Sequence, residues 1–191
     1  MVEVEQKFRG ADFADLEHRL VARGARGGAS RQETDHYFNA PDRDFARTDE
    51  ALRVRRIGVA NFVTYKGPKR DLQTKTRTEI EVPLAEGDAA AADFEQLLCR
   101  LGYQSVAVVR KDRRKFQLQR DGFLLEISLD RVEGLGDFAE LEIVAIEEQL
   151  EAAKAVLLLT ATELGLTAVE RRSYLELLLA SRTSAAGKPA G

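Results

Sequence analysis

The sequence is poor in the residues that most often serve as nucleophiles and thiolate metal ligands. Cys99 is the only cysteine among 191 residues, so an intrachain disulfide is excluded, and there are only two histidines. The apolar neighbours Leu97, Leu98 and Leu101 favour a small buried thiol over a catalytic one. The chain has no zinc-ligand spacing and no glycine-rich phosphate loop. These absences argue against thiol catalysis, zinc chemistry and a P-loop nucleotide site.

Long apolar runs and an excess of basic charge are also missing. No apolar run approaches the roughly 20 residues that a membrane-spanning helix needs, and the first residues lack the basic and apolar regions of a signal peptide. The chain carries 29 Lys and Arg against 32 Asp and Glu, a net charge of −3, whereas a general nucleic-acid binder has a clear basic excess. We therefore expect a cytoplasmic protein without membrane or nucleic-acid partners.

Period-two alternation of apolar and polar residues is abundant, and it indicates strands. We predict them near residues 2–9, 33–39, 51–58, 61–67, 76–84, 105–119, 122–131 and 138–145. Apolar residues at helical spacing predict helices over about 12–24, 88–102 and 147–164, with a shorter one at 174–179. This order favours an α+β fold, an eight-stranded antiparallel β-barrel with helices packed outside. We expect one domain over residues 1–182 and a flexible tail over 183–191.

Charged residues repeat at every second position on many of these strands. Glu3, Glu5 and Lys7 share one face of the first strand. The same spacing occurs in Arg53 and Arg55; Arg77, Glu79 and Glu81; Lys111 and Arg113; Glu126, Ser128 and Asp130; and Glu140 and Glu142. Such alternation by itself is typical of a half-buried strand whose polar face meets water. Carboxylates only about 7 Å apart repel each other, however, and a solvated face gains little from them.

The charged faces make better physical sense if they converge on one polar interior while the apolar faces pack outward against helices. A small barrel keeps such an interior only if ions or a ligand compensate its charges. Carboxylates suit Mg²⁺ or Mn²⁺, and Arg and Lys suit phosphate oxygens. The pattern therefore favours a metal-bound polyphosphate as the ligand.

Several motifs in this pattern resemble a known superfamily. Glu3-x-Glu5-x-Lys7 is similar to the ExExK motif of the CYTH, or triphosphate tunnel metalloenzyme, superfamily. Segments that follow in the family's order are 35–38, 51–55, 64–68, 77–81, 126–130, 138–142 and 173–177. The resemblance covers about residues 1–179 and implies an eight-stranded antiparallel tunnel that acts on triphosphate compounds with a divalent metal.

The resemblance also implies roles for individual residues. The acidic residues on the metal side are Glu3, Glu5, Asp130, Glu140 and Glu142, and the triphosphate-binding cations are Lys7, Arg53, Arg55, Lys66, Arg77, Lys111 and Arg113. The residues expected to take part in catalysis are Glu3, Glu5, Lys7, Glu79 and Glu81. Glu79 and Glu81 resemble a carboxylate pair that orients the cations or assists the metal. A purely structural pairing of these two with arginines remains an open alternative.

Segments 32–38, 44–49 and 173–177 are most similar to the class IV adenylyl cyclase branch. That branch implies conversion of ATP to cyclic AMP and pyrophosphate with Mg²⁺ or Mn²⁺, and a homodimer is common in it. A triphosphatase acting on tripolyphosphate, thiamine triphosphate or a nucleoside triphosphate is the main alternative. The chain has no tryptophan, the residue that stacks on thiazolium in animal thiamine triphosphatases, which argues against that substrate. A non-catalytic polyphosphate-binding module is the third possibility.

Overall fold

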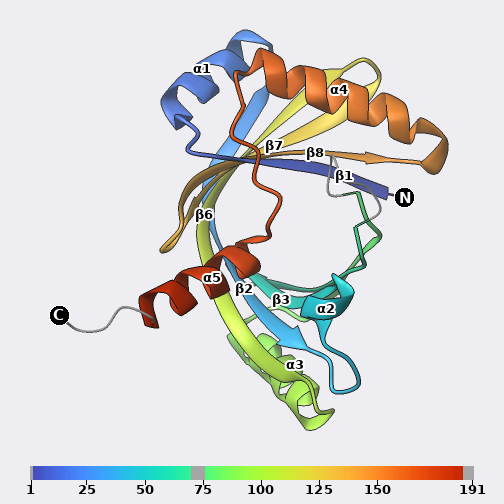
Figure 1. Ribbon diagram of the computed structural model, residues 1–191, viewed down its shortest axis with the longest axis vertical. Coiled ribbons are helices and arrows are strands. Elements are labelled where there is room, and N and C mark those ends of the chain that lie inside the picture. Colours follow the sequence, from blue (N-terminus) through green and yellow to red (C-terminus); the bar gives the residue numbers. More distant parts are fainter. Residues whose placement is uncertain (1, 70–75, 187–191) are drawn as a thin grey trace.

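The computed structural model describes residues 2–69 and 76–186 (Figure 1). Its strands are β1 (Val2–Arg9), β2 (Arg26–Asn39), β3 (Ala51–Ile57), β4 (Ala60–Lys66), β5 (Glu79–Leu84), β6 (Gln104–Arg120), β7 (Phe123–Val132) and β8 (Gly136–Ala145). Its helices are α1 (Phe13–Ala22), α2 (Phe45–Thr48), α3 (Asp88–Arg100), the 3₁₀ turn η1 (Glu147–Gln149), α4 (Leu150–Glu163) and α5 (Tyr174–Ala186). The α+β fold class is confirmed.

The strands form one antiparallel sheet in the order β1-β8-β7-β6-β2-β3-β4-β5. Figure 1 shows that this sheet curls into a half-barrel. Its two edges approach each other where Glu3 on β1 forms a bridge with Arg77, just before β5, and the backbone N–H of Arg77 donates to the carbonyl oxygen of Glu3 over 3.3 Å. The expected barrel is therefore nearly closed, and its concave face is enclosed by residues from both edges.

The hairpin between β6 and β7 turns at Asp121 and Gly122, a residue pair that is typical of tight hairpin turns. Their φ angles are 47° and 82°, the left-handed values that a tight hairpin turn of this kind requires at both positions. The turn sets the register of the two strands and places Arg113 directly opposite Asp130. A buried ion pair in the site depends on this local turn.

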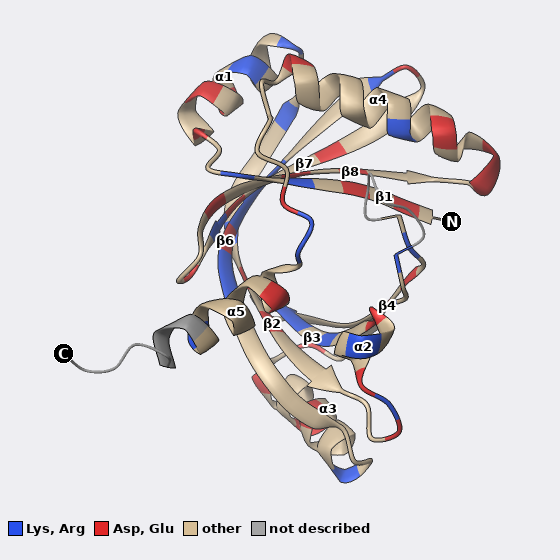
Figure 2. Ribbon diagram, viewed as in Figure 1, with Lys and Arg blue, Asp and Glu red and all other residues tan. Residues whose placement is uncertain are grey.

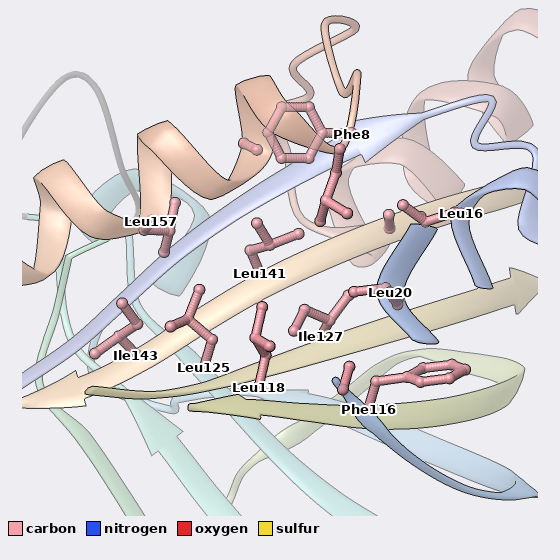
Figure 3. Packing of buried hydrophobic residues seen from close by; sticks show 14 of the residues in the cluster. Phe8, Leu16, Leu20, Phe116, Leu118, Leu125, Ile127, Leu141, Ile143 and Leu157 are labelled. Atoms are coloured by element: carbon pink, nitrogen blue, oxygen red, sulfur yellow. The ribbon is translucent and has the colours of Figure 1, made fainter. Parts of the chain in front are cut away.

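The main hydrophobic core lies on the convex face of β1, β8, β7 and β6, beneath α1 and α4 (Figure 3). Ile127 and Leu141 from the sheet are fully buried there together with Leu20 of α1 and Leu157 of α4. Burying each such side chain contributes roughly 1.5–3 kcal/mol. A second cluster, which includes Phe38, Val54 and Leu98, packs α3 against the other half of the sheet. The apolar faces thus point outward, which leaves the charged faces inside.

Strand β2 is longer than the sequence pattern indicates, since it begins at Arg26 rather than near residue 33. Residues 26–32 are polar or small and exposed, so they carry no hydrophobic alternation. They are strand because the long β6 supplies backbone partners, for example Gln117 opposite Arg26. The turn between β3 and β4 falls at residues 58 and 59, slightly before the expected position.

The four expected helices are present in the expected order, with differences at their ends, and the short helix α2 was not predicted. Helix α5 runs to Ala186, past the expected domain boundary at 182, and residues 187–191 lie outside the described residues. The prediction that Cys99 is buried is wrong: it is exposed, because Leu98 takes the core position on α3. No helix among the described residues has the length and apolar character that a membrane span requires. The cytoplasmic location stays a prediction.

Candidate active site

The concave face of the sheet encloses a cavity of about 420 Å³. All eight strands contribute to its lining, and Figure 2 shows Lys, Arg, Asp and Glu distributed along the strands around the opening. The expected site residues that line it are Glu5, Lys7, Arg53, Arg55, Lys66, Arg77, Glu79, Glu81, Lys111, Arg113, Glu140 and Glu142. Glu3 and Asp130 lie behind this lining. The structure therefore gathers residues from remote parts of the chain around one space.

One part of the cavity wall is a cluster of cations built around Asp35 on β2. Arg55 donates two hydrogen bonds to Asp35, from Nε at 2.7 Å and from a terminal nitrogen at 2.8 Å. Lys111 Nζ lies 3.4 Å from the same carboxylate, and Arg53 lies 3.5 Å from it. Burial raises the pKa of Asp35, but Arg53, Lys111 and Arg55 outweigh burial and hold the pKa well below its usual range. Asp35 therefore stays ionised and fixes three cations at once.

Arg113 is the second anchor of the cationic cluster. Its Nε donates to Asp130 over 2.6 Å, and a terminal nitrogen pairs with both Asp130 and Glu140. The hydroxyl of Tyr174 also donates to Asp130 over 2.8 Å. Burial lowers the pKa of Arg113, but Asp130 and Glu140 more than compensate and raise it well above its usual range. Asp130 thus holds Arg113 in place.

Lys7 lies between Glu140 and the ring of Tyr174. Its Nζ is 3.6 Å from a carboxylate oxygen of Glu140 and 3.9 Å from the centre of the Tyr174 ring. The ammonium group of Lys111 faces the same ring at 5.4 Å. Such cation–π contacts stabilise buried cations without neutralising them. Helix α5 therefore begins with a side chain that supports two lysines of the site.

Among residues 2–69 and 76–186, two buried arginine nitrogens in the wall have no hydrogen-bond partner. They are the Nε atoms of Arg53 and Arg77, and both residues line the cavity. A buried donor without a partner costs roughly 1–3 kcal/mol. Burial and the nearby Arg113 also lower the pKa of Lys111, which reflects uncompensated positive charge. An anion in the cavity would relieve both costs, so this wall fits phosphate oxygens.

A second part of the cavity wall carries a row of carboxylates. Glu5 on β1 lies directly opposite Glu142 on β8, and Glu142 lies directly opposite Glu126 on β7. Like charges in such positions are destabilising. Burial raises the pKa of Glu142 to about 7, against the attraction of Lys66 and with the help of Glu5 and Glu126. We call Glu5, Glu126 and Glu142 the acidic row.

Beside the acidic row, Lys66 joins Glu3 and Glu79. Its Nζ lies 3.3 Å from both carboxylate oxygens of Glu3 and is also paired with Glu79. Burial raises the pKa of Glu3 well above its usual range, against Lys66. Burial also raises the pKa of Glu79, yet hydrogen bonds from Glu3 and Lys66 lower it to about 2. Of these two carboxyl groups, Glu3 therefore has the greater tendency to hold a proton.

The carboxylates suit a divalent cation by their chemistry. They supply hard oxygen ligands of the kind that Mg²⁺ and Mn²⁺ prefer. Among residues 2–69 and 76–186, no group of three or more His, Cys, Asp or Glu side chains is gathered closely enough to hold a metal ion. Mg²⁺ is usually bound through one or two carboxylates together with waters and substrate phosphates. The acidic row supplies carboxylates of that kind.

The comparison with known families is decisive here. The chain matches the CYTH domain family over residues 1–174. It belongs to the CYTH family. This CYTH domain is 38% identical over 180 residues to MJ0240 of Methanocaldococcus jannaschii, a protein provisionally named an adenylate cyclase, with 93% of this chain and 98% of the relative covered. It is 32% identical over 188 residues to the adenylate cyclase CyaB of Aeromonas hydrophila. This match covers 95% of this chain and 91% of the relative.

A solved structure supports the same family assignment. The PH1819 protein of Pyrococcus horikoshii superposes with a TM-score of 0.82 at 39% identity. The match covers 94% of this chain and 99% of that one. The arrangement of strands and helices around the cavity is therefore shared with an experimentally determined relative.

The site also contains residues to which the sequence analysis gave no role. They are Glu33, Asp35, Glu126, Lys115 and Tyr174. Glu33 and Asp35 carry the same two-residue spacing as the expected site residues, so a signal was present. The roles assigned to individual residues stay predictions. The contacts of Asp130 and Glu140 favour a role in holding Arg113 and Lys7. Glu81 accepts a hydrogen bond from the hydroxyl of Thr64 over 2.9 Å.

Proposed function

We propose that this CYTH domain converts ATP to cyclic AMP and pyrophosphate with the help of Mg²⁺ or Mn²⁺. The observation that carries the proposal is the cavity itself, which is lined both by anchored cations and by a row of carboxylates. This arrangement suits a metal-bound triphosphate. The names of two relatives that cover more than nine-tenths of the chain support ATP as the compound and cyclisation as the reaction.

In this proposal the cationic cluster binds the triphosphate. Lys7, Arg53, Arg55, Lys111 and Arg113, with Arg77 and Lys66 beside them, supply the donors. Because Asp35 and Asp130 hold the guanidinium groups, little reorganisation is needed when the substrate binds. Charge-assisted hydrogen bonds of this kind are roughly twice as strong as neutral ones.

The acidic row, with Glu3 and Glu140 nearby, would hold the divalent cation. When bound, the cation neutralises negative charge on the phosphate oxygens and on the pyrophosphate that leaves. Lys66 lies between Glu3 and Glu79 and would keep these carboxylates in position. The side chains of the two walls would thus orient the substrate so that attack is in line.

The proposed reaction forms one bond and breaks one. The 3′-oxygen of the ribose attacks the α-phosphorus, and the bond from that phosphorus to the oxygen that bridges the α and β phosphorus atoms breaks. Pyrophosphate leaves with this oxygen, and the proton of the 3′-hydroxyl passes to a carboxylate or to water. A triphosphatase would instead direct water to the terminal phosphorus within the same cavity.

Product analysis tests the proposal. Purified protein is incubated with ATP or with tripolyphosphate, each with Mg²⁺ or Mn²⁺, and the products are identified by chromatography and phosphorus NMR. Cyclic AMP with pyrophosphate is the expected result. Release of orthophosphate would identify a triphosphatase, and binding without turnover would identify a non-catalytic module. Glu142→Gln should abolish turnover, while Glu148→Gln on the exposed η1 turn serves as the matched control.

A further inference from the structure

The cavity has a third part that neither charged wall explains. Between α2 and α5, which lie on different sides of the opening in Figure 1, its lining becomes apolar. The residues here are Phe45, Val106, Leu175 and Leu179, and we call this part the mouth. Phosphate oxygens gain nothing from such a surface, whereas an uncharged organic group buries area against it.

Helix α5 connects the mouth to the cationic cluster. Tyr174 at its start contacts Lys7 and Asp130, and Leu175 and Leu179 follow on the same helix. Leu175 and Leu179 are four residues apart, so they share one face of the helix. Leu179 is 37% exposed although it is apolar and lines the cavity. A group that extends from phosphates bound at the cations therefore reaches an apolar rim.

The mouth is lined by acidic side chains, and the cations beside them form ion pairs with these acids. Asp44, Asp49, Glu50 and Glu176 all line it. Hydrogen bonds from Arg43, Thr48 and Tyr65 lower the pKa of Glu50 to about 2, so Glu50 is ionised at neutral pH. The cations beside these acids, Arg43 and Lys69, are paired with Glu50 and Asp49.

Negative charge at the mouth repels a further phosphate group, but the carboxylates accept hydrogen bonds from amino groups such as those of a nucleobase. The chemistry of the cavity therefore changes from phosphate binding at the cationic cluster to ring binding at the mouth. One class of compound matches this change: a polyphosphate attached to an uncharged, flat, hydrogen-bonding ring.

We propose that the mouth between α2 and α5 binds the nucleoside end of the substrate and so selects nucleoside triphosphates over inorganic tripolyphosphate. The inference rests on the proposed function, because it assigns the phosphate end to the cationic cluster. Leu179 is the specificity residue that can be tested most directly, since its exposure makes it unimportant for folding.

Isothermal titration calorimetry measures the affinity of the protein for a nucleotide and for an inorganic triphosphate separately. The probes are α,β-methylene-ATP, which is not cyclised because a carbon replaces the bridging oxygen, and inorganic tripolyphosphate, both with Mg²⁺. Wild-type protein should bind the nucleotide more tightly. Leu179→Ser should weaken nucleotide binding about fivefold through the apolar contact it removes, and should leave tripolyphosphate binding unchanged. Leu97→Ser, at an exposed leucine of α3 away from the cavity, should change neither affinity.

The outcomes separate this inference from the function on which it rests. If Leu179→Ser weakens both ligands equally, or neither, the mouth does not bind the nucleoside and the inference is overturned. Equal affinity of the wild type for both ligands overturns it as well, while the charged walls keep their proposed role. If the wild type binds neither ligand, the proposed function itself fails. Circular dichroism melting of both variants checks that folding is unchanged.

Discussion

The two charged walls of the cavity contrast in how their charges are balanced. In the cationic cluster the guanidinium groups of Arg55 and Arg113 each have a buried carboxylate partner, so these groups are fixed before any ligand binds. In the acidic row the carboxylates face one another, and burial, with the help of Glu5 and Glu126, raises the pKa of Glu142. Buried carboxylates thus hold Arg55 and Arg113 in the first wall, whereas in the second wall like charges lie side by side. A bound cation would therefore stabilise the acidic row.

The largest expected loss of stability comes from removing a carboxylate that holds an arginine of the cationic cluster. Asp130→Ala leaves Arg113 buried without its main partner, which typically costs about 3–5 kcal/mol of unfolding free energy. Urea denaturation measures this loss, and activity should disappear with it. The matched control is Asp137→Ala, which removes an ion pair with the exposed Arg131 and should cost less than about 1 kcal/mol. Similar losses in the two variants would contradict the distinction between the walls.

A smaller effect on stability, and in the opposite direction, is expected in the acidic row, where a substitution should stabilise the protein. The folded pKa of Glu142 is about 7 against an ordinary value of 4.5, so the folded state binds the proton more tightly. Stability should therefore fall as pH rises from about 4.5 to about 7 in protein free of divalent cations. Glu142→Gln cannot ionise, so it should flatten this dependence and be more stable at pH 8, by roughly 1–3 kcal/mol.

Denaturation midpoints across this pH range, with and without Mg²⁺, test the acidic row. Mg²⁺ should stabilise the wild type at pH 8 more than it stabilises Glu142→Gln, because the substitution removes a ligand. Glu148→Gln provides the comparison at an exposed glutamate of the η1 turn. A Glu142→Gln protein with unchanged pH dependence would show that the row carries no strain.

The smallest effect sharpens the link between α5 and the cationic cluster. Tyr174→Phe removes the hydroxyl that donates to Asp130 but keeps the ring beside Lys7. The loss of one hydrogen bond should cost about 1 kcal/mol of stability, and the KM for ATP should rise only a few-fold. Tyr174→Leu removes the ring as well, so it should raise KM further. Equal KM values for the two variants would mean that the ring does not support the lysines.

Much of this protein was predictable because strand alternation is local. Glu3, Glu5 and Lys7 share a face in any extended strand, and the repulsion between such neighbouring carboxylates led to the prediction that the face is interior. The start of β2 was not predictable, because residues 26–32 have no apolar pattern and pair only through β6. The burial of Asp35 among three cations also depends on which strands are neighbours, since Arg55 and Lys111 come from β3 and β6.

By itself, the sequence determined which side chains share a face, the α+β class and the resemblance to the CYTH family. The tertiary structure decided which charges meet. The register of β1, β8 and β7 aligns Glu5, Glu142 and Glu126 in one row, and the register of β6 and β7 pairs Arg113 with Asp130. The physical reason is that alternation belongs to a single strand, whereas charge pairing depends on register and on the curl of the sheet. The apolar mouth beside these walls likewise exists only because the fold brings α2 and α5 to one opening.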